Sequence, residues 1–422
     1  MLKLNKARLK NGLEIYHIPL NKGSKVISVD IFYKVGSRNE TMGKSGIAHM
    51  LEHLNFKSTK NLKAGEFDEI VKGFGGVNNA STGFDYTHYF IKCTNSNLDK
   101  ALWLYADLMQ NLKLKNNEFL PERDVVAEER RWRTDNNPLG YLYFRLYNHA
   151  FLYHPYHWTP IGFTNDIANW SIDDIRDFHE RFYQPNNAIL IVSGDISKKE
   201  VFELTKKHFK DIPNKHKTVA KPHCIEPEQD GARTAVLNKK SEVDMVALAF
   251  KTPPFNDKDQ PAINALSEYL SNGKSSLLWQ ELVEKTQIAN QVYAYNMDSI
   301  DENLFIFLIV CNPGVKAEDA RGRLLNIIEK VKTDKIDEAS LERVKNLIKS
   351  DFIYSFDSAS KVANLYGSYL ARGDIAPLYS LKESIDKIDA ELLQKTASKY
   401  FIDKHSTCIL LKGGLNGESK DD

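Results

Sequence analysis

Cysteine is scarce in this chain, and its few positions are far apart. The 422 residues include four cysteines, Cys93, Cys224, Cys311 and Cys408, and no two of them form a C-x-x-C pair. Small secreted domains that depend on disulfides are rich in cysteine, and sulfur-ligated metal sites need closely spaced thiols. Both classes are disfavoured, and we expect reduced, buried thiols instead.

The chain also lacks an excess of charge of either sign. It has 57 basic and 56 acidic side chains, which gives a formal net charge of +1 at pH 7. Nucleic-acid-binding proteins usually show a strong basic excess, so we expect no nucleic-acid partner. The locally basic stretch 206–221 is interpreted as a solvated helix end followed by a linker.

Long apolar segments are absent as well. No run of about eighteen apolar residues occurs, so the sequence predicts no membrane span. The N-terminus is positively charged, but the apolar stretch that follows in a signal peptide is missing. These absences predict a cytoplasmic protein, unless a leader was removed from the chain.

Apolar residues are nevertheless plentiful. Hydrophobic residues make up 42% of the chain and aromatic residues 11%, which is enough for a large buried core. The length exceeds one ordinary core and predicts at least two domains. A stretch rich in proline, glycine and charge divides the chain. We therefore predict an N-terminal domain over 1–212, a linker over 213–232, a C-terminal domain over 233–412 and a polar tail over 413–422.

The two halves share one order of predicted elements. Each contains a helix, a strand, a helix and a second helix, at 67–71, 86–91, 98–109 and 120–126 and again at 279–283, 303–309, 317–331 and 340–345. A repeat with a period of about 200 residues suggests duplication. Because only the first half contains two histidines within one helical turn, we expect a metal in that half alone.

The strongest local signal is His49-Met50-Leu51-Glu52-His53. On a helix at about 100° per residue, His49 and His53 lie about 40° apart on one face, and Glu52 lies about 60° to the other side of His49. Leu51 points roughly opposite, toward a core. Two imidazoles suit zinc, and an adjacent carboxylate can deprotonate a metal-bound water. The pattern arises by chance in about one such chain in fifty, so two surface histidines are the alternative.

Candidates for a third zinc ligand lie in the helical segment 118–135. A catalytic zinc usually has three protein ligands and one open position. Glu122 and Glu129 are seven residues apart and share one face of a helix. Considered alone, this segment is an ordinary charged helix, and its residues do not decide between a ligand and a solvated face.

Three segments, in order, resemble the inverted zinc motif and its surroundings in the insulinase/pitrilysin family of metallopeptidases. Segment 46–59 resembles the motif helix, and 76–87 resembles the edge strand beside the metal. Segment 122–129 resembles the helix whose last glutamate, 76 positions after His53, is the third ligand. The resemblance covers nearly the whole chain. It is nearest to the short, two-domain branch that includes mitochondrial processing peptidase subunits and bacterial zinc peptidases.

The resemblance implies a fold and a cofactor. The fold would be α+β, with two homologous halves, each a mainly antiparallel sheet packed with helices, that form half of a clamshell chamber. His49, His53 and Glu129 would bind one zinc ion. Glu52 would be the general base and then the proton donor to the leaving amine. Glu122 would hold the outer N–H of a histidine.

A substrate site is implied beside the metal. Asn79 and Ala80 would lie on an edge strand that pairs with an extended peptide, so that backbone hydrogen bonds give affinity. An Asn-Asn-Ala stretch is also typical of a turn, which is the alternative. Two further histidines in the loop 153–157 have no partner ligand in the sequence, so loop packing is favoured for them.

One departure from the family pattern concerns the second half. Active members often carry an Arg and a Tyr seven residues apart, which are thought to hold the substrate carbonyl oxygen as negative charge develops. Val283 and Asn290 stand at the aligned positions. We therefore expect a homologous partner chain that supplies the missing Arg/Tyr pair, with a homodimer as the alternative.

Together these observations predict a zinc-dependent endopeptidase that cleaves extended or unfolded peptides and is the catalytic subunit of a two-subunit enzyme. A non-catalytic scaffold subunit of the same fold is one alternative, and a metal-binding module without hydrolysis is another. Retention of all four metal and base residues favours the peptidase. Manganese or cobalt could occupy a similar site, and the sequence does not identify the substrate.

Overall fold

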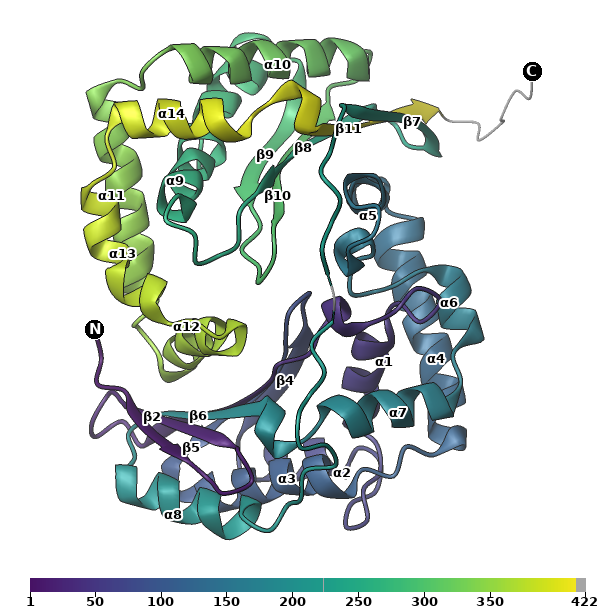
Figure 1. The fold of residues 1–422 in the computed structure, drawn as a ribbon, viewed down its shortest axis with the longest axis vertical. Coiled ribbons are helices and arrows are strands. Elements are labelled where there is room, and N and C mark those ends of the chain that lie inside the picture. The colour runs from purple at the N-terminus through teal and green to yellow at the C-terminus, as the bar shows by residue number, and fades with distance from the viewer. Residues whose placement is uncertain (223, 415–422) are drawn as a thin grey trace. The chain divides into compact units, whose positions relative to one another are not determined.

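Strands rich in β-branched and aromatic residues build two separate sheets, each packed with helices (Figure 1). The structure, a computed structural model, describes residues 1–222 and 224–414. Its residues divide into two compact units. Unit 1 comprises Met1–Glu129, Trp158–His223 and Ile353–Tyr379, and unit 2 comprises Arg130–His157, Cys224–Phe352 and Ser380–Asp422.

Unit 1 holds the larger sheet and the motif helix. Its strands are β1 (Asn5–Arg8), β2 (Glu14–Pro19), β3 (Val26–Tyr33), β4 (Val77–Thr82), β5 (Thr87–Thr94) and β6 (Ala188–Gly194). Its helices are α1 (Ile47–Leu54), α2 (Glu66–Gly73), α3 (Leu98–Asn111), α4 (Asn116–Arg130), α6 (Thr164–Asn169), α7 (Ile172–Phe182), α8 (Lys198–Phe209) and α12 (Ala359–Arg372), with short helical turns η1 (Ser37–Asn39), η2 (Asn95–Asn97) and η5 (Pro185–Asn187).

The sheet of unit 1 has the order β1-β2-β6-β3-β5-β4, so β4 is an edge strand. Strand β2 runs parallel to β6, and the other neighbouring strands pair antiparallel. Every residue of β6 is buried, as expected for a strand with neighbours on both sides and helices on both faces. The exposure of β4 alternates along its length, as expected at an edge.

Helices cover both faces of this sheet. Residues 27, 29, 31 and 33 of β3 belong to the core that includes α3, because alternate side chains of a strand point to the same face. Helix α12 packs on the opposite face, against β3 and β6, and there Gly367 meets the ring of Phe32. A Cβ at Gly367 would lie 2.2 Å from that ring, so only glycine allows the helix to approach so closely.

Unit 2 contains the second sheet. Its strands are β7 (Arg233–Lys240), β8 (Met245–Thr252), β9 (Ala289–Asn296), β10 (Asn303–Cys311) and β11 (Ser406–Gly414). Its helices are α5 (Pro138–Ala150), α9 (Gln260–Ser271), α10 (Ala317–Thr333), α11 (Glu338–Tyr354), α13 (Ala376–Asp386) and α14 (Ala390–Tyr400), with turns η3 (Arg131–Asp135), η4 (Pro155–His157), η6 (Trp279–Lys285) and η7 (Asp403–His405); α11 and α13 each cross the boundary between the units.

The two sheets repeat one topology. The order β7-β11-β8-β10-β9 of unit 2 matches β2-β6-β3-β5-β4 of unit 1 strand by strand. The first pair in each series is parallel, and the others are antiparallel. The prediction of an α+β fold with two similar halves, each a mainly antiparallel sheet packed with helices, is therefore confirmed.

The compact units exchange segments between the two halves of the chain. Helix α12 comes from the second half but packs on β3 and β6 of unit 1. Helix α5 comes from the first half but packs on β8 and β11 of unit 2. The predicted domains, 1–212 and 233–412, do not include this exchange. Amino-acid composition indicates where a linker lies, but it does not indicate which sheet a helix packs against.

The segments between the halves and at the C-terminus have simple local structure. The described residues of the predicted linker, 213–222 and 224–232, form no helix or strand. Residues 413 and 414 of the predicted tail complete β11, and 415–422 lie outside the described residues. Three cysteines are buried, Cys224 is partly exposed, and all four are free thiols. Among the described residues, no helix has both the length and the apolar character needed to cross a membrane.

Candidate metal centre

Helix α1 separates an apolar face from a polar one. The buried face comprises Ile47, Ala48, Met50, Leu51 and Leu54. On the other face, His49 and His53 keep 13% and 21% of their side-chain surface exposed. Burial of the apolar face against the core of unit 1 therefore fixes the direction in which both imidazoles point.

A buried glutamate fixes the start of α1. Glu40 accepts hydrogen bonds from the backbone N–H groups of Gly46 and Ala48, each at 2.8 Å, and from the indole Nε1 of Trp158 at 2.7 Å. A carboxylate in this position satisfies N–H groups at the helix N-terminus that have no partner within the helix. Gly46 has a φ of 85°, and a Cβ there would lie 2.7 Å from the carbonyl oxygen of Ile161, so the turn requires glycine.

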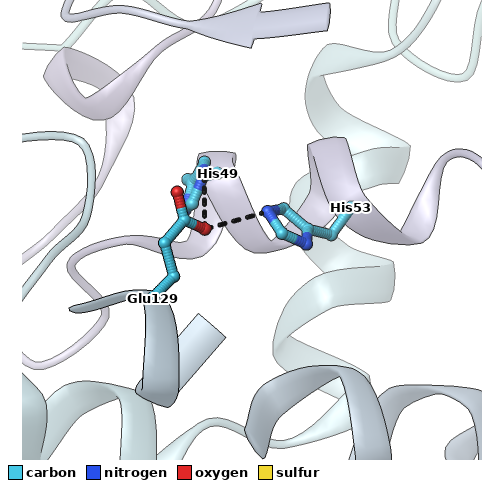
Figure 2. Close-up of side chains that lie close together, drawn as sticks. All are labelled: His49, His53 and Glu129. Carbon is cyan, nitrogen blue, oxygen red and sulfur yellow. Dashed lines mark ion pairs between the residues drawn. The ribbon is translucent and has the colours of Figure 1, made fainter. Parts of the chain in front are cut away.

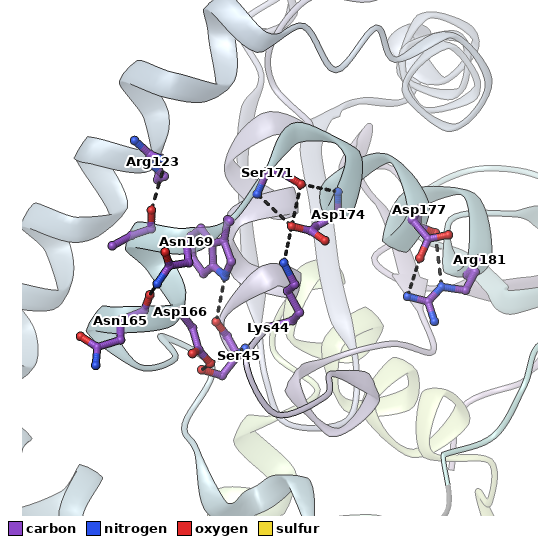
Figure 3. Close-up of polar contacts among 12 residues, drawn as sticks. Lys44, Ser45, Arg123, Asn165, Asp166, Asn169, Ser171, Asp174, Asp177 and Arg181 are labelled. Atoms are coloured by element: carbon purple, nitrogen blue, oxygen red, sulfur yellow. Dashed lines mark hydrogen bonds and ion pairs between the residues drawn. The ribbon is translucent and has the colours of Figure 1, made fainter.

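The residues before α1 are tied to α6 and α7 (Figure 3). The backbone N–H and the hydroxyl of Ser45 both donate to Oδ2 of Asp166, at 2.9 and 2.6 Å. The ammonium of Lys44 lies 2.5 Å from Oδ2 of Asp174, which also caps the first turn of α7. The motif helix is thus anchored by hydrogen bonds at its N-terminus and by apolar packing along its length.

Helix α4 brings a carboxylate to the two histidines. Oε2 of Glu129 lies 3.6 Å from Nε2 of His49 and 3.4 Å from Nε2 of His53, and Figure 2 shows the three side chains pointing toward one another. Zinc bonds of about 2.0–2.2 Å in a tetrahedral site separate neighbouring ligand atoms by about 3.3–3.6 Å. Both nitrogen–oxygen distances match this spacing, and all three ligand atoms lie within 4.8 Å of one another, so the group fits zinc in chemistry and size.

The second ring nitrogen of His53 is held by Glu122. Oε1 of Glu122 lies 2.9 Å from Nδ1 of His53, and Oε2 lies 2.5 Å from the ammonium of Lys57. A carboxylate at Nδ1 holds a proton on that nitrogen, so Nε2, which faces Glu129, is the nitrogen at which a metal ion would replace a proton. Burial disfavours the charged form of His53, but contacts with Glu122 and Glu129 outweigh burial and raise the pKa of His53 to about 9.

Glu52 is oriented by the edge strand. The hydroxyl of Thr82 on β4 donates to Oε2 of Glu52 at 2.5 Å. Glu52 and His53 also line an open pocket of about 440 Å³, together with Asn78 and Asn79 of β4. The N–H of Ala80 donates to the side-chain Oδ1 of Asn79 at 2.9 Å, and both residues belong to the edge strand β4. The predicted substrate residues thus lie on an edge strand and not in a turn.

A second group of potential metal-binding residues lies in unit 2. The ligand atoms of His154, Cys224 and Asp301 all lie within 4.8 Å of one another. Nδ1 of His154, however, accepts a hydrogen bond from the backbone N–H of Tyr156 at 3.0 Å. The proton of a neutral imidazole must then sit on Nε2, which donates to Asp301 at 2.9 Å and has no lone pair for a cation. Hydrogen bonding therefore accounts for the His154 imidazole, whose neighbours Cys224 and Asp301 the sequence did not indicate.

The aligned positions of the missing Arg/Tyr pair lie in unit 2. Val283 is partly buried in η6, and Asn290 is exposed on the edge strand β9. Tyr293 is exposed on the same strand, and its hydroxyl donates to Gln291 at 3.0 Å. No arginine stands seven residues before Tyr293 or Tyr295.

Three residues around the site were not assigned a role from the sequence. Glu40 lies in an unremarkable loop, and nothing in its neighbours indicates contact with α1. Thr82 belongs to the recognised edge-strand segment, but its bond to Glu52 spans 30 residues. Lys57 follows the motif by four positions, a spacing at which its side chain lies near that of His53 on a helical turn. Only that last spacing was a usable signal.

The site combines a helix that carries an inverted two-histidine motif, a glutamate from a second helix and an adjacent edge strand. This combination defines the architecture of the inverted-motif zinc metallopeptidases. Comparison with known proteins agrees. Residues 18–154 match the family described as Insulinase (Peptidase family M16), and 169–348 match its companion, described as Peptidase M16 inactive domain. The chain belongs to peptidase family M16.

Relatives span nearly the full chain. Zinc protease PqqE of Helicobacter pylori is 54% identical over 406 residues, which cover 96% of this chain and 91% of that protein. The crystal structure of a protease from Helicobacter pylori superposes with a TM-score of 0.96 at 53% identity, over 98% of this chain and 100% of that one. A probable mitochondrial-processing peptidase subunit beta of Arabidopsis thaliana is 26% identical, over 94% of this chain and 76% of that protein.

Proposed function

We propose that this protein is a zinc-dependent endopeptidase that hydrolyses extended or unfolded peptides. The observation that carries the proposal is the convergence of His49, His53 and Glu129 at the spacing of a tetrahedral zinc site. The Helicobacter pylori relative that is 54% identical is a zinc protease, which supports the same conclusion. We assign one zinc ion to each chain.

The chain's own residues would bind and orient the metal and move the proton. A zinc ion, when bound, lowers the pKa of water toward about 7 and polarises a carbonyl. His49, His53 and Glu129 would hold it. Glu52 would accept the proton of the attacking water and return it to the leaving amine. The bond from Thr82 limits rotation of the Glu52 carboxylate, so the base is positioned before substrate arrives.

The substrate would bind as an added strand. Strand β4 pairs only with β5 among the described strands, and its outer edge adjoins the pocket that Glu52 and His53 line. A peptide that pairs with this edge would have to replace the side chain of Asn79 at the N–H of Ala80. Recognition through backbone hydrogen bonds requires an extended segment, which explains a preference for unfolded peptides.

The active form would contain two chains. Val283 and Asn290 supply neither the cation nor the phenol that active family members often place at these positions. We assign the missing donors to a homologous chain of the same fold that carries the Arg/Tyr pair, and this chain would then be the catalytic subunit. The Arabidopsis thaliana relative, a probable processing peptidase subunit beta, supports this arrangement.

Metal analysis and a panel of fluorogenic, unstructured peptides test the proposal. We expect about one zinc per chain, weak cleavage by this chain alone and a large increase on addition of the homologous chain. Chelation should abolish cleavage, and zinc should restore it. Glu52→Gln should keep the zinc and lower kcat by about 10³-fold, because general acid–base catalysis contributes roughly 10²–10⁴-fold.

Glu69→Gln is the matched control, since Glu69 is exposed on α2 of the same unit. That variant should cleave as the wild type does. Full cleavage by Glu52→Gln would contradict the role of Glu52. A wild-type chain that binds no zinc and cleaves nothing, with or without its homologue, would instead indicate a scaffold subunit. Full activity of the chain alone, without response to any partner, would refute the two-chain arrangement.

A further inference from the structure

Lys57 contacts the candidate metal centre through one intermediary. Its ammonium lies 2.5 Å from Oε2 of Glu122, and Oε1 of the same carboxylate lies 2.9 Å from Nδ1 of His53. The backbone N–H of Lys57 donates to the carbonyl oxygen of Leu54, so the turn that ends α1 determines where the side chain begins. The three residues therefore form a continuous path from the surface to a ring nitrogen of a proposed ligand.

The carboxylate in the middle of this path has two oxygens with different tasks. The Glu122 side chain is 13% exposed, whereas that of Lys57 is 30% exposed. A carboxylate with only one fixed oxygen can rotate about its last bond and lose alignment with the imidazole. With Lys57 on Oε2, both oxygens of Glu122 are engaged, and Oε1 remains at Nδ1 of His53.

The backbone around Lys57 is held in place by independent contacts. The hydroxyl of Ser58 donates to Oε2 of Glu118 on α4 at 2.8 Å. The hydroxyl of Thr59 donates to Asp107 of α3, and the N–H of Leu62 donates back to that hydroxyl at 2.9 Å. The hydrogen bond between Ser58 and Glu118 already attaches this segment to α4. The ion pair of Lys57 is therefore not needed for that attachment, and its effect is on the orientation of Glu122.

We propose that Lys57 is a positioning residue for the metal centre: its ammonium fixes the Glu122 carboxylate, which holds His53 in the tautomer and ring orientation that presents Nε2 to zinc. The inference rests on the proposed zinc site. Lys57 also lines the pocket beside Glu52 and His53, so zinc affinity measured without substrate is the quantity that isolates its effect through Glu122.

Electrostatic repulsion alone predicts the opposite change in zinc affinity when the charge of Lys57 is removed. The sign of that change therefore tests the inference. A cation near a zinc ion repels it, so removal of the charge at Lys57 would strengthen zinc binding if Coulomb repulsion dominated. Release of Glu122 to become an additional ligand would also strengthen binding. A positioning role requires that removal of Lys57 weaken zinc binding instead.

The experiment measures the zinc Kd of the full-length chain by competition with a chromophoric chelator. We expect Lys57→Met to raise the Kd about tenfold, at the lower end of the 10–100-fold range for loss of groups that hold a metal ligand. Lys57→Arg should restore most of the affinity, since a guanidinium can bind the same carboxylate. Lys60→Met is the matched control, because Lys60 is exposed three residues further on, and its Kd should equal that of the wild type.

A double-mutant cycle tests whether Lys57 affects zinc binding through Glu122. In a Glu122→Gln background, Lys57→Met should change the zinc Kd less than twofold, because the intermediary is already impaired. Thermal unfolding of the zinc-free chains should show Lys57→Met and Lys60→Met folded alike, so that a lower affinity does not reflect misfolding.

Unchanged or tighter zinc binding by Lys57→Met overturns the inference, as does equal loss with and without Glu122. These results leave the proposed function standing, since the wild type still binds zinc. Absence of zinc binding by the wild type overturns both.

Discussion

Two groups of histidine and carboxylate side chains, one in each unit, look alike by distance and differ in chemistry. In unit 1, Nδ1 of His53 faces a carboxylate, and Nε2 faces Glu129. In unit 2, Nδ1 of His154 accepts a backbone N–H, and Nε2 gives its proton to Asp301. The first imidazole can exchange its Nε2 proton for a cation, whereas hydrogen bonds within the loop already engage both nitrogens of the second.

The difference shows that proximity alone does not define a metal centre. A neutral imidazole has one donor and one acceptor nitrogen, so the partner of one nitrogen determines what the other can do. A donor at Nδ1 therefore excludes a metal at Nε2, and an acceptor at Nδ1 favours one. Burial follows the same division, because the His154 side chain is 2% exposed, whereas that of His53 remains 21% exposed.

The largest expected effect is the difference in zinc binding between variants of His53 and His154. His53→Ala should weaken zinc binding by more than about 100-fold, beyond the 10–100-fold typical of groups that only hold a ligand. His154→Ala should leave zinc binding within twofold of the wild type. Metal analysis after dialysis against a chelator compares the two variants directly. Loss of zinc from the His154 variant alone would reverse the comparison.

A third histidine, His179, is expected to make the free energy of unfolding depend on pH. His179 on α7 stacks on Tyr183, and its Nε2 has no hydrogen-bond partner among the described residues. Burial lowers the pKa of His179 to about 4, and nearby Lys215 adds to the effect. In the unfolded chain the pKa of His179 is near 6.5. Between these two pKa values the unfolded chain binds a proton at His179 that the folded chain does not bind, so the free energy of unfolding falls as pH falls from about 6.5 to about 4.

The magnitude of this loss is up to about 3 kcal/mol, at about 1.4 kcal/mol per pKa unit. Urea unfolding at several pH values measures it. His179→Phe keeps the ring stacking and should remove this part of the pH dependence. The same slope in the variant and the wild type would assign the pH dependence to other groups.

The next effect concerns stability in unit 2. His154→Phe fills the same space but leaves the N–H of Tyr156 without its acceptor and Asp301 without its donor. A buried donor that loses its partner costs about 1–3 kcal/mol. We therefore expect the free energy of unfolding to fall by about 2 kcal/mol. Equal stability would mean that packing, and not hydrogen bonding, holds this loop.

The smallest effect is expected at the third member of that group. Cys224→Ser should change neither the zinc content nor the free energy of unfolding by more than about 0.5 kcal/mol, since most substitutions at partly exposed positions have small effects. Chelation and unfolding measured on the same sample check both quantities. A drop in zinc content on this substitution would show that the second group binds metal after all.

Much of the fold was predictable from local patterns. The helices predicted at 67–71 and 98–109 and the strand predicted at 86–91 correspond to α2, α3 and β5. Duplication was visible as a repeated order of elements, and the two sheets share their strand order. Local patterns succeed here because apolar periodicity is imposed by the face that each element buries.

The exchange of segments between units was not predictable from those patterns. Helix α12 is amphipathic like its neighbours, and its sequence does not state which sheet it will cover. Its close contact depends on Gly367 meeting Phe32, two residues separated by more than 300 positions. A small residue on a helix is too common to indicate such a partner.

The sequence by itself determined which residues could bind zinc. The spacing of His49, Glu52 and His53 is local, and helical geometry places all three on one face whatever surrounds the helix. Resemblance then selected Glu129 from the available acids. Tertiary structure alone decided that Glu129 approaches both histidines, that Thr82 orients Glu52, and which nitrogen of each imidazole keeps its lone pair. These depend on hydrogen bonds between distant segments, and such bonds form only when packed elements fix both partners in place.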